Sequence, residues 1–161
     1  AGSQWMGIEV GKPRVVVTDL MGNSRFVPAH AGVLLIEADD LPKFVRGLRA
    51  RPVVISGLIE AEPSRDSVQI RIRNPYREPV SVRLKLQARG GALGAVPATV
   101  SIARLGSATV RIPWTAAASA RGDARSTLRV VYPGGTVTRS FEPSSKGDRV
   151  RVSGPPSIPG E

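Results

Sequence analysis

The stretch SVQIRIRNPYREPVSVRLKLQARGGALGAVPATVSIARLGSATVRIP, residues 67–113, decides the fold. Aliphatic residues alternate with polar residues along 68–73, along 80–87 and again along 108–114. A two-residue period puts one face of a strand in a core and the other face in water. The first two runs are separated by Asn74–Pro79, which has a turn-forming asparagine and two prolines that cannot donate to a β-ladder. Three β-strands are therefore predicted here.

The composition of the whole chain fits the same interpretation. The 161 residues include 17 glycines and 14 prolines, which is typical of proteins with many short turns. Cysteine is absent, which excludes disulfides and thiolate metal sites. No run approaches the roughly 20 apolar residues of a membrane span, so none is predicted. The first ten residues lack the pattern of a signal peptide, and a chain that begins at Ala1 is expected to have lost an initiator Met or a leader.

Residues 1–50 are predicted to form a small α+β docking element. A strand pattern runs over 8–20, with an interruption at 11–13, and returns after a turn at 21–24. The apolar run 32–38 is consistent with a buried strand or the start of a helix. Leu41, Phe44, Val45 and Leu48 have helical spacing after a capping Asp39 or Asp40, so a helix is expected over 41–49.

Residues 51–143 are predicted to form the main β domain, and residues 144–161 an extended Pro/Gly-rich tail that docks on a neighbouring subunit. Residues 53–62 are expected to form its first strand, bent at Gly57. In the last hairpin, Val137, Arg139 and Phe141 share one parity. Either that strand is bulged or Arg139 extends along the sheet edge to water.

Three segments of this domain carry a resemblance to a known family: NPYREPVSVRLKLQ, VPATVSIARLGSATVRIPWTA and GDARSTLRVVYPGGTVTRSF. They resemble a bacterial or viral immunoglobulin-like β-sandwich over about residues 52–142, closest to the group that includes the MSP and ASH types. The resemblance implies about seven strands in two packed sheets. The chain departs from antibody-type domains because it has no Cys pair and because Trp114 lies late in the sequence.

The charge is strongly basic and unevenly placed. Residues 1–50 contain six Lys/Arg and five Asp/Glu, whereas residues 51–161 contain seventeen and eight. Arginine binds carboxylate and phosphate in a planar, bidentate manner, so a polyanionic partner is one interpretation. A solvated surface on a thermostable or high-GC protein is the other. The outward strand positions supply the candidate contacts for a polyanion or a partner protein: Arg71, Arg73, Arg83, Lys85, Arg111 and Arg129.

Other motifs are expected to be structural, and neither a catalytic site nor a cofactor or metal site is predicted. His30 is the only histidine and is expected to lie in a loop. Asp39 and Asp40, with Glu37 nearby, do not have EF-hand spacing and are expected to cap the helix. The Gly90–Gly94 run lacks the ending of a phosphate-binding loop. Arg121-Gly122-Asp123 spells the adhesion tripeptide that integrins recognise. Because Arg, Gly and Asp are common in this chain, the tripeptide is expected to arise by chance.

These observations favour a non-catalytic structural or interaction protein over an enzyme. Its partners are expected to be other protein subunits, in a homo-oligomer or a larger assembly such as a virion, where it serves as a capsid decoration or tail-associated protein. An extracellular surface or pilus subunit is an alternative. A polyanion- or nucleic-acid-binding protein that uses the Arg-rich sheet faces is the other. A virion or extracellular location is favoured, and a cytoplasmic one stays open.

Overall fold

The computed structural model describes residues 3–48, 51–64, 66–89, 91–116 and 125–142. Within these ranges the chain forms fourteen strands and no helix. Every strand pair is antiparallel. The predicted mainly-β class is therefore confirmed.

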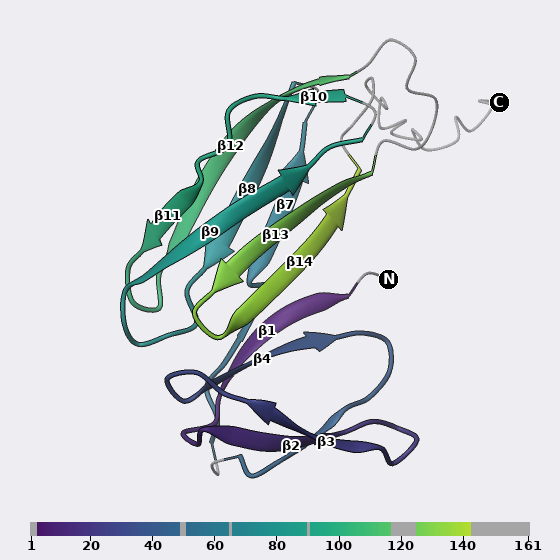
Figure 1. Ribbon diagram of the computed structural model, residues 1–161, viewed down its shortest axis with the longest axis vertical. Coiled ribbons are helices and arrows are strands. Elements are labelled where there is room, and N and C mark those ends of the chain that lie inside the picture. Colours follow the sequence, from purple (N-terminus) through teal and green to yellow (C-terminus); the bar gives the residue numbers. More distant parts are fainter. Residues whose placement is uncertain (1–2, 49–50, 65, 90, 117–124, 143–161) are drawn as a thin grey trace, which may run out of the picture.

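Two four-stranded sheets lie face to face in the larger part of the molecule (Figure 1). We call them the β8 sheet and the β9 sheet. The β8 sheet has the order β10 (Gly91–Leu93), β12 (Ser107–Ala116), β8 (Ser67–Arg73), β7 (Ile59–Pro63). The β9 sheet has the order β11 (Thr99–Ile102), β9 (Val80–Gln87), β13 (Ser126–Tyr132), β14 (Gly135–Phe141).

The predicted alternation places one face of each strand in the space between the sheets. On β8, Val68, Ile70 and Ile72 are fully buried, whereas Gln69 and Arg71 are exposed. The strands of the β9 sheet turn their own aliphatic residues to the same core. The buried core residues from the β9 sheet include Val82, Leu84, Ile102, Leu128, Val130 and Val137.

The chain crosses from one sheet to the other at Asn74–Pro79, where the sequence predicts a turn. Asn74 is fully buried, and its side-chain amide donates to the carbonyls of Glu78 at 2.7 Å and Ala103 at 3.0 Å. Its Oδ1 accepts the backbone N–H of Tyr76 at 2.9 Å. One buried side chain therefore fixes the backbone of the corner that joins the two sheets.

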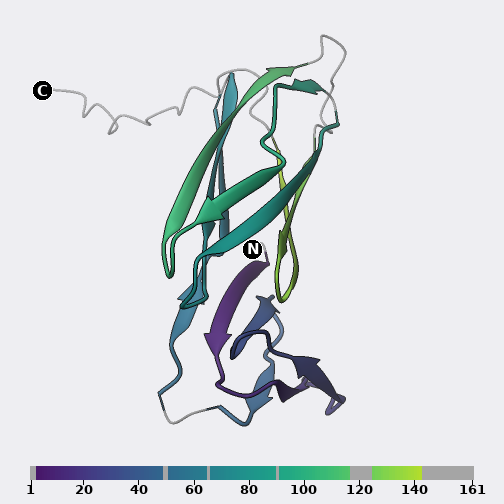
Figure 2. The same cartoon turned by 60° about the vertical axis from the view of Figure 1, so that its left-hand side comes forward.

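Two three-stranded sheets make up the smaller N-terminal part, residues 3–56 (Figure 2). They pack over a core made of Ile8, Val10, Val15, Val17 and Leu34. The β1 sheet has the order β4 (Val33–Ala38), β1 (Gln4–Glu9), β6 (Val54–Ser56), and the β2 sheet has the order β3 (Ser24–Pro28), β2 (Arg14–Thr18), β5 (Phe44–Arg46).

The predicted hairpin of β2 and β3 is confirmed, and its turn is held by one carboxylate. Asp19 accepts the backbone N–H groups of Met21 at 2.9 Å and of Asn23 at 3.0 Å. It also accepts the side-chain amide of Asn23, and this bond holds the pKa of Asp19 below its ordinary value. Gly22 supplies the positive φ of +83° that the turn requires.

The predicted helix over 41–49 is wrong for the described residues 41–48, so the N-terminal element is all-β there instead of α+β. Phe44–Arg46 form β5, which pairs with β2. A helix of about ten residues is marginal by itself, and the open edge of β2 offers a ladder to Phe and Val side chains that suit strands. Asp39 does not cap a helix: it accepts the N–H of Leu41 and pairs with Lys43 at 2.9 Å.

The single bent strand expected over 53–62 is also wrong. The chain instead forms β6 and β7, which lie in different sheets on either side of Gly57. Gly57 has φ +61°, a conformation that ends a ladder and that side chains seldom adopt. The turn therefore passes the chain from the N-terminal part to the β8 sheet.

The parity of β14 resolves in favour of an extended arginine. The ladder between β13 and β14 pairs every residue from Ser126 with Phe141 to Tyr132 with Gly135, without a bulge. Val137 and Phe141 are buried, and Arg139 between them is half-buried. Its Nη1 donates to the carbonyl of Ser3 at 3.0 Å, so the guanidinium reaches out of the core toward the N-terminal part.

The N-terminal part packs against the corner of the larger part. Gly7 lies so close to Pro75 that an added Cβ would come within 2.5 Å of the proline Cβ. The ring of His30 meets that of Tyr76 edge to face, with centroids 5.7 Å apart. Both contacts lie at the Asn74–Pro79 corner, and the bond from Arg139 to Ser3 joins the two parts at a second place.

Candidate interaction surfaces

The structure divides the six predicted basic residues between the two outer sheet faces. Arg71, Arg73 and Arg111 lie on the β8 sheet, and the remaining three lie on the β9 sheet. The two sets are therefore on opposite sides of the same core, and the acids beside each set distinguish them. The β9 set consists of Arg83, Lys85 and Arg129.

Acidic side chains accompany the cations of the β8 sheet. Arg73 lies 3.9 Å from Glu60, and Arg111 lies 3.9 Å from Asp66 and donates to the Ser67 hydroxyl at 3.1 Å. The side chains of these two pairs are between 33% and 78% exposed, so each pair contributes little stability. The acids offset part of the positive charge of the arginines, and we call the outer surface of the β8 sheet the mixed face. Its acids are Glu60, Glu62 and Asp66.

The outer face of the β9 sheet carries cations and hydroxyls without an acid at any described outward strand position. We call it the basic face. Arg83, Lys85 and Arg129 are all exposed, and none of them forms an ion pair with a described residue. The other outward positions are occupied by Ser81, Gln87, Thr99, Ser101, Thr127, Val131, Thr136, Thr138 and Ser140.

Two of these cations lie directly opposite each other. Lys85 on β9 is the cross-strand partner of Arg129 on β13. Like charges in this position destabilise a sheet, so folding alone gives no reason to place them there. A bound anion would remove the repulsion, and the pair is therefore the centre of the candidate site.

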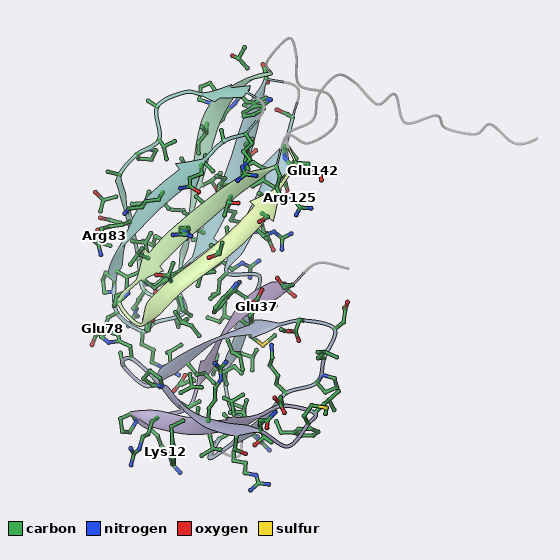
Figure 3. The ribbon with its side chains drawn as sticks, turned by 45° about the vertical axis from the view of Figure 1, so that its right-hand side comes forward. Lys12, Glu37, Glu78, Arg83, Arg125 and Glu142 are labelled. Atoms are coloured by element: carbon green, nitrogen blue, oxygen red, sulfur yellow. The ribbon has the colours of Figure 1, made fainter. Side chains whose placement is uncertain are left out.

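Arg89 extends the basic face beyond the predicted set, and Arg125 marks its end, because Arg125 also lines a hollow with Glu37 and Glu142. Arg89 and Arg125 line a hollow of about 210 Å³ together with Gln87 and Thr127. Arg83 and Arg125 lie toward opposite ends of the sheet, so the cations follow its length (Figure 3). The sequence pattern did not identify this pair because both lie outside the alternating strand cores.

Large exposed apolar side chains gather in the other part of the molecule. Eight of the nine in the described residues belong to residues 20–54, and the ninth is Leu105. Phe26 and Phe44 are 67% and 58% exposed, although each belongs to a strand. The alternation of side chains along β3 would have identified Phe26 as exposed, because its neighbour Val27 faces inward. The others are Leu20, Met21, Leu41, Leu48, Val53 and Val54.

The remaining motifs have structural surroundings. His30 packs on Tyr76, as described above, and the hydrogen bond from Lys43 holds the pKa of Asp39 below its ordinary value. Among the described residues no group of three or more His, Asp or Glu side chains is placed to hold a metal ion. Of the Gly90–Gly94 run, Gly91–Leu93 form β10. Arg121-Gly122-Asp123 and the tail 144–161 lie outside the described residues.

A hollow of about 570 Å³ lies between the N-terminal part and β14. Its polar side chains are hydroxyls, two carboxylates and two guanidiniums, without an imidazole or a second base beside a hydroxyl to activate it. The residues that line it are Ser3, Glu37, Arg125, Thr138, Arg139, Ser140, Phe141 and Glu142.

In the parts of the chain that the structure describes, there is no helix of the length and apolar character needed to cross a membrane. Comparisons with known protein families, with curated proteins and with solved structures found no match.

Proposed function

We propose that this chain is a non-catalytic interaction protein: an immunoglobulin-like β-sandwich joined near Gly57 to an N-terminal docking element that includes β6. It serves as a subunit of a larger assembly such as a virion, as a capsid decoration or tail-associated protein. The two face-to-face sheets and the crossing at Asn74–Pro79 support the sandwich assignment. A subunit of a pilus or another extracellular surface would use the same features.

The observation that carries this proposal is the concentration of exposed apolar side chains in the N-terminal part. Eight of nine such residues among those described belong to about a third of the chain. Apolar side chains gathered on one part of a surface mark a protein interface more often than scattered ones do. The N-terminal part therefore docks the chain, and the larger part is displayed outward.

The test is the mass of the chain recovered from its native setting, measured by light scattering. Apolar docking predicts a complex much heavier than the 17.0 kDa chain. The complex should persist at about 1 M salt, where exposed charge contacts are screened. A 17.0 kDa particle at both low and high salt would contradict the proposal.

The basic face favours a second candidate function, which is binding to a polyanion such as a nucleic acid. Its three predicted cations have no acidic neighbours at the described outward positions of their sheet, and two of them repel each other across β9 and β13. Phosphate contacts would compensate that repulsion. The aromatic side chains that stack on bases in single-strand sites are not part of this face, so the binding would be sequence-independent.

Salt titration of heparin or DNA binding tests this second candidate. Replacing Arg83, Lys85 and Arg129 together by Gln should lower the slope of log affinity against log salt by about 2 to 3. The matched control removes the same charge elsewhere, by Arg71→Gln, Arg104→Gln and Arg111→Gln. Equal effects of the two triple variants would show that net charge alone binds the polyanion, and would reject a specific basic face.

A further inference from the structure

Among the described residues, none covers the outer face of the β2 sheet, where Phe26 and Phe44 are exposed. Val15, Val17 and Val45 of this sheet face inward, where Val15 and Val17 are buried in the N-terminal core and Val45 packs against it. The alternate positions therefore point outward. They include Phe26, which is the cross-strand partner of Val16, and Phe44, which is the partner of Thr18.

The two phenylalanines flank β2 on its two neighbouring strands. Two strand spacings sideways and two residues along the strand place them about 12 Å apart. Between them lie Val16 and Thr18, both only partly exposed, so the face is a low apolar platform with an aromatic side chain on either side. Aromatic side chains of this exposure are typical anchors of protein interfaces.

The charges of this face have one sign. Its charged outward residues are Arg14 and Arg46, which are both exposed. The guanidinium carbon of Arg14 lies 5.0 Å from the centre of the Phe26 ring, within the range of a cation–π contact. An occupant that complements the platform must therefore combine apolar side chains with carboxylates.

We propose that this outer face, formed by Phe26, Val16, Phe44, Arg14 and Arg46, is the docking site for an acidic protein segment that carries aliphatic side chains. The inference rests on the proposed docking function and identifies the surface and the chemistry of its partner. A second copy fits poorly, because a twofold pairing would set the same arginines against each other. A nucleic acid fits less well, because residues 1–50 have nearly balanced charge.

The test uses the isotope-labelled chain and a short synthetic peptide of alternating glutamate and leucine. The peptide should shift the backbone amide signals of Val16, Phe26 and Phe44 in a titration followed by NMR. Peptides of alternating glutamate and serine, or of lysine and leucine, should bind much more weakly. A peptide that shifts none of these three signals would overturn the inference.

Surface variants separate the apolar from the charged contribution. Phe26→Ser with Phe44→Ser should weaken peptide binding by about tenfold or more, as expected for two anchors. Arg14→Ser with Arg46→Ser should weaken it mainly at low salt. Leu105→Asn is the control, because Leu105 is exposed in the larger part and its φ of +51° suits Asn.

Three other outcomes would each contradict the inference. An oligonucleotide of thymidines that shifts the same three amides more strongly than the peptide does would assign the face to nucleic acid. A mass that doubles with concentration and returns to one chain in the double phenylalanine variant would assign it to a second copy. A native complex that persists in that variant would leave the docking function intact and place it elsewhere on the N-terminal part.

Discussion

Among the described residues, Asn74 combines complete burial with the largest set of side-chain hydrogen bonds. Its side chain joins the end of β8 to the turn before β9 and to the loop after β11. A buried polar residue in this position specifies the crossing, because no apolar side chain of its size satisfies the same carbonyls. The corner also contacts the N-terminal part, so its conformation affects both parts of the molecule.

Replacing Asn74 by Ala should therefore lower the free energy of unfolding by about 2 to 4 kcal/mol, because it leaves buried backbone groups without partners. Urea denaturation followed by circular dichroism measures this loss. Asn23→Ala is the control: its side chain is exposed on the β2–β3 turn, so its loss should be much smaller. Equal losses at the two positions would contradict the role given to Asn74.

The two tyrosines give the molecule a defined response to alkali. Burial, and then the proximity of Tyr76, raise the pKa of Tyr132 far above its ordinary value of 10.0, and burial raises that of Tyr76. The folded state keeps its phenol protons at a pH where the unfolded chain releases them. The stabilisation is therefore complete below pH 10 and falls as the pH rises beyond it.

We expect phenolate absorbance to appear above pH 10 only together with the loss of β-sheet circular dichroism. The reason is that Tyr132 donates its hydroxyl to the carbonyl of Arg73 at 2.8 Å inside the molecule. Parallel titrations of absorbance and circular dichroism make the comparison. Phenolate that forms near pH 10 in a chain that stays folded would contradict the burial of both rings.

At the level of strands, removing the repulsion on the basic face should stabilise the fold and weaken polyanion binding. Lys85→Glu would place a carboxylate opposite Arg129 and should raise the free energy of unfolding by about 0.2 to 1 kcal/mol. The same variant should elute from a heparin column at lower salt. Lys12→Glu makes the same change of charge away from this sheet, and should not stabilise the fold. A loss of stability in Lys85→Glu would contradict the cross-strand repulsion.

A second prediction at this scale concerns two side chains of the strand β5. A helix over 41–49 would bury Phe44 and Val45 on one face, whereas the strand exposes Phe44 and packs Val45 against the N-terminal core. Val45→Ser should therefore destabilise the chain by about 1 kcal/mol, and Phe44→Ser by less than about 0.5 kcal/mol. Thermal unfolding of the two variants measures the difference, and comparable losses would favour the helix.

The strands β8 and β5 differ in how far the sequence alone predicts them. Along β8 the alternation is long, regular and bounded by turn residues, so its strand and buried face could be read from the sequence. The segment 41–49 is short, and its apolar spacing also fits a helix; the open edge of β2, which no local pattern records, decides between them. The division of cations into a mixed and a basic face likewise depends on which strands pair.

The whole molecule presents two surfaces of different physical character. The N-terminal part exposes large apolar side chains and has nearly balanced charge, whereas the β9 sheet exposes cations and hydroxyls. The contacts at Gly7 and Pro75 and at His30 and Tyr76 fix one part on the other. An apolar interface is only weakly affected by salt, whereas an exposed charged one is screened. Ionic strength therefore separates the two surfaces in a single experiment.

The most direct measurement is lysine cross-linking of the chain in its native setting, at low salt and at about 1 M salt, followed by mass spectrometry. Lys12 and Lys43 report on the N-terminal part, and Lys85 reports on the basic face. The account predicts that cross-links from Lys12 or Lys43 to a partner protein persist at high salt, while those from Lys85 disappear. Cross-links to a partner from Lys85 alone, or from the N-terminal lysines only at low salt, would contradict docking through an apolar N-terminal surface.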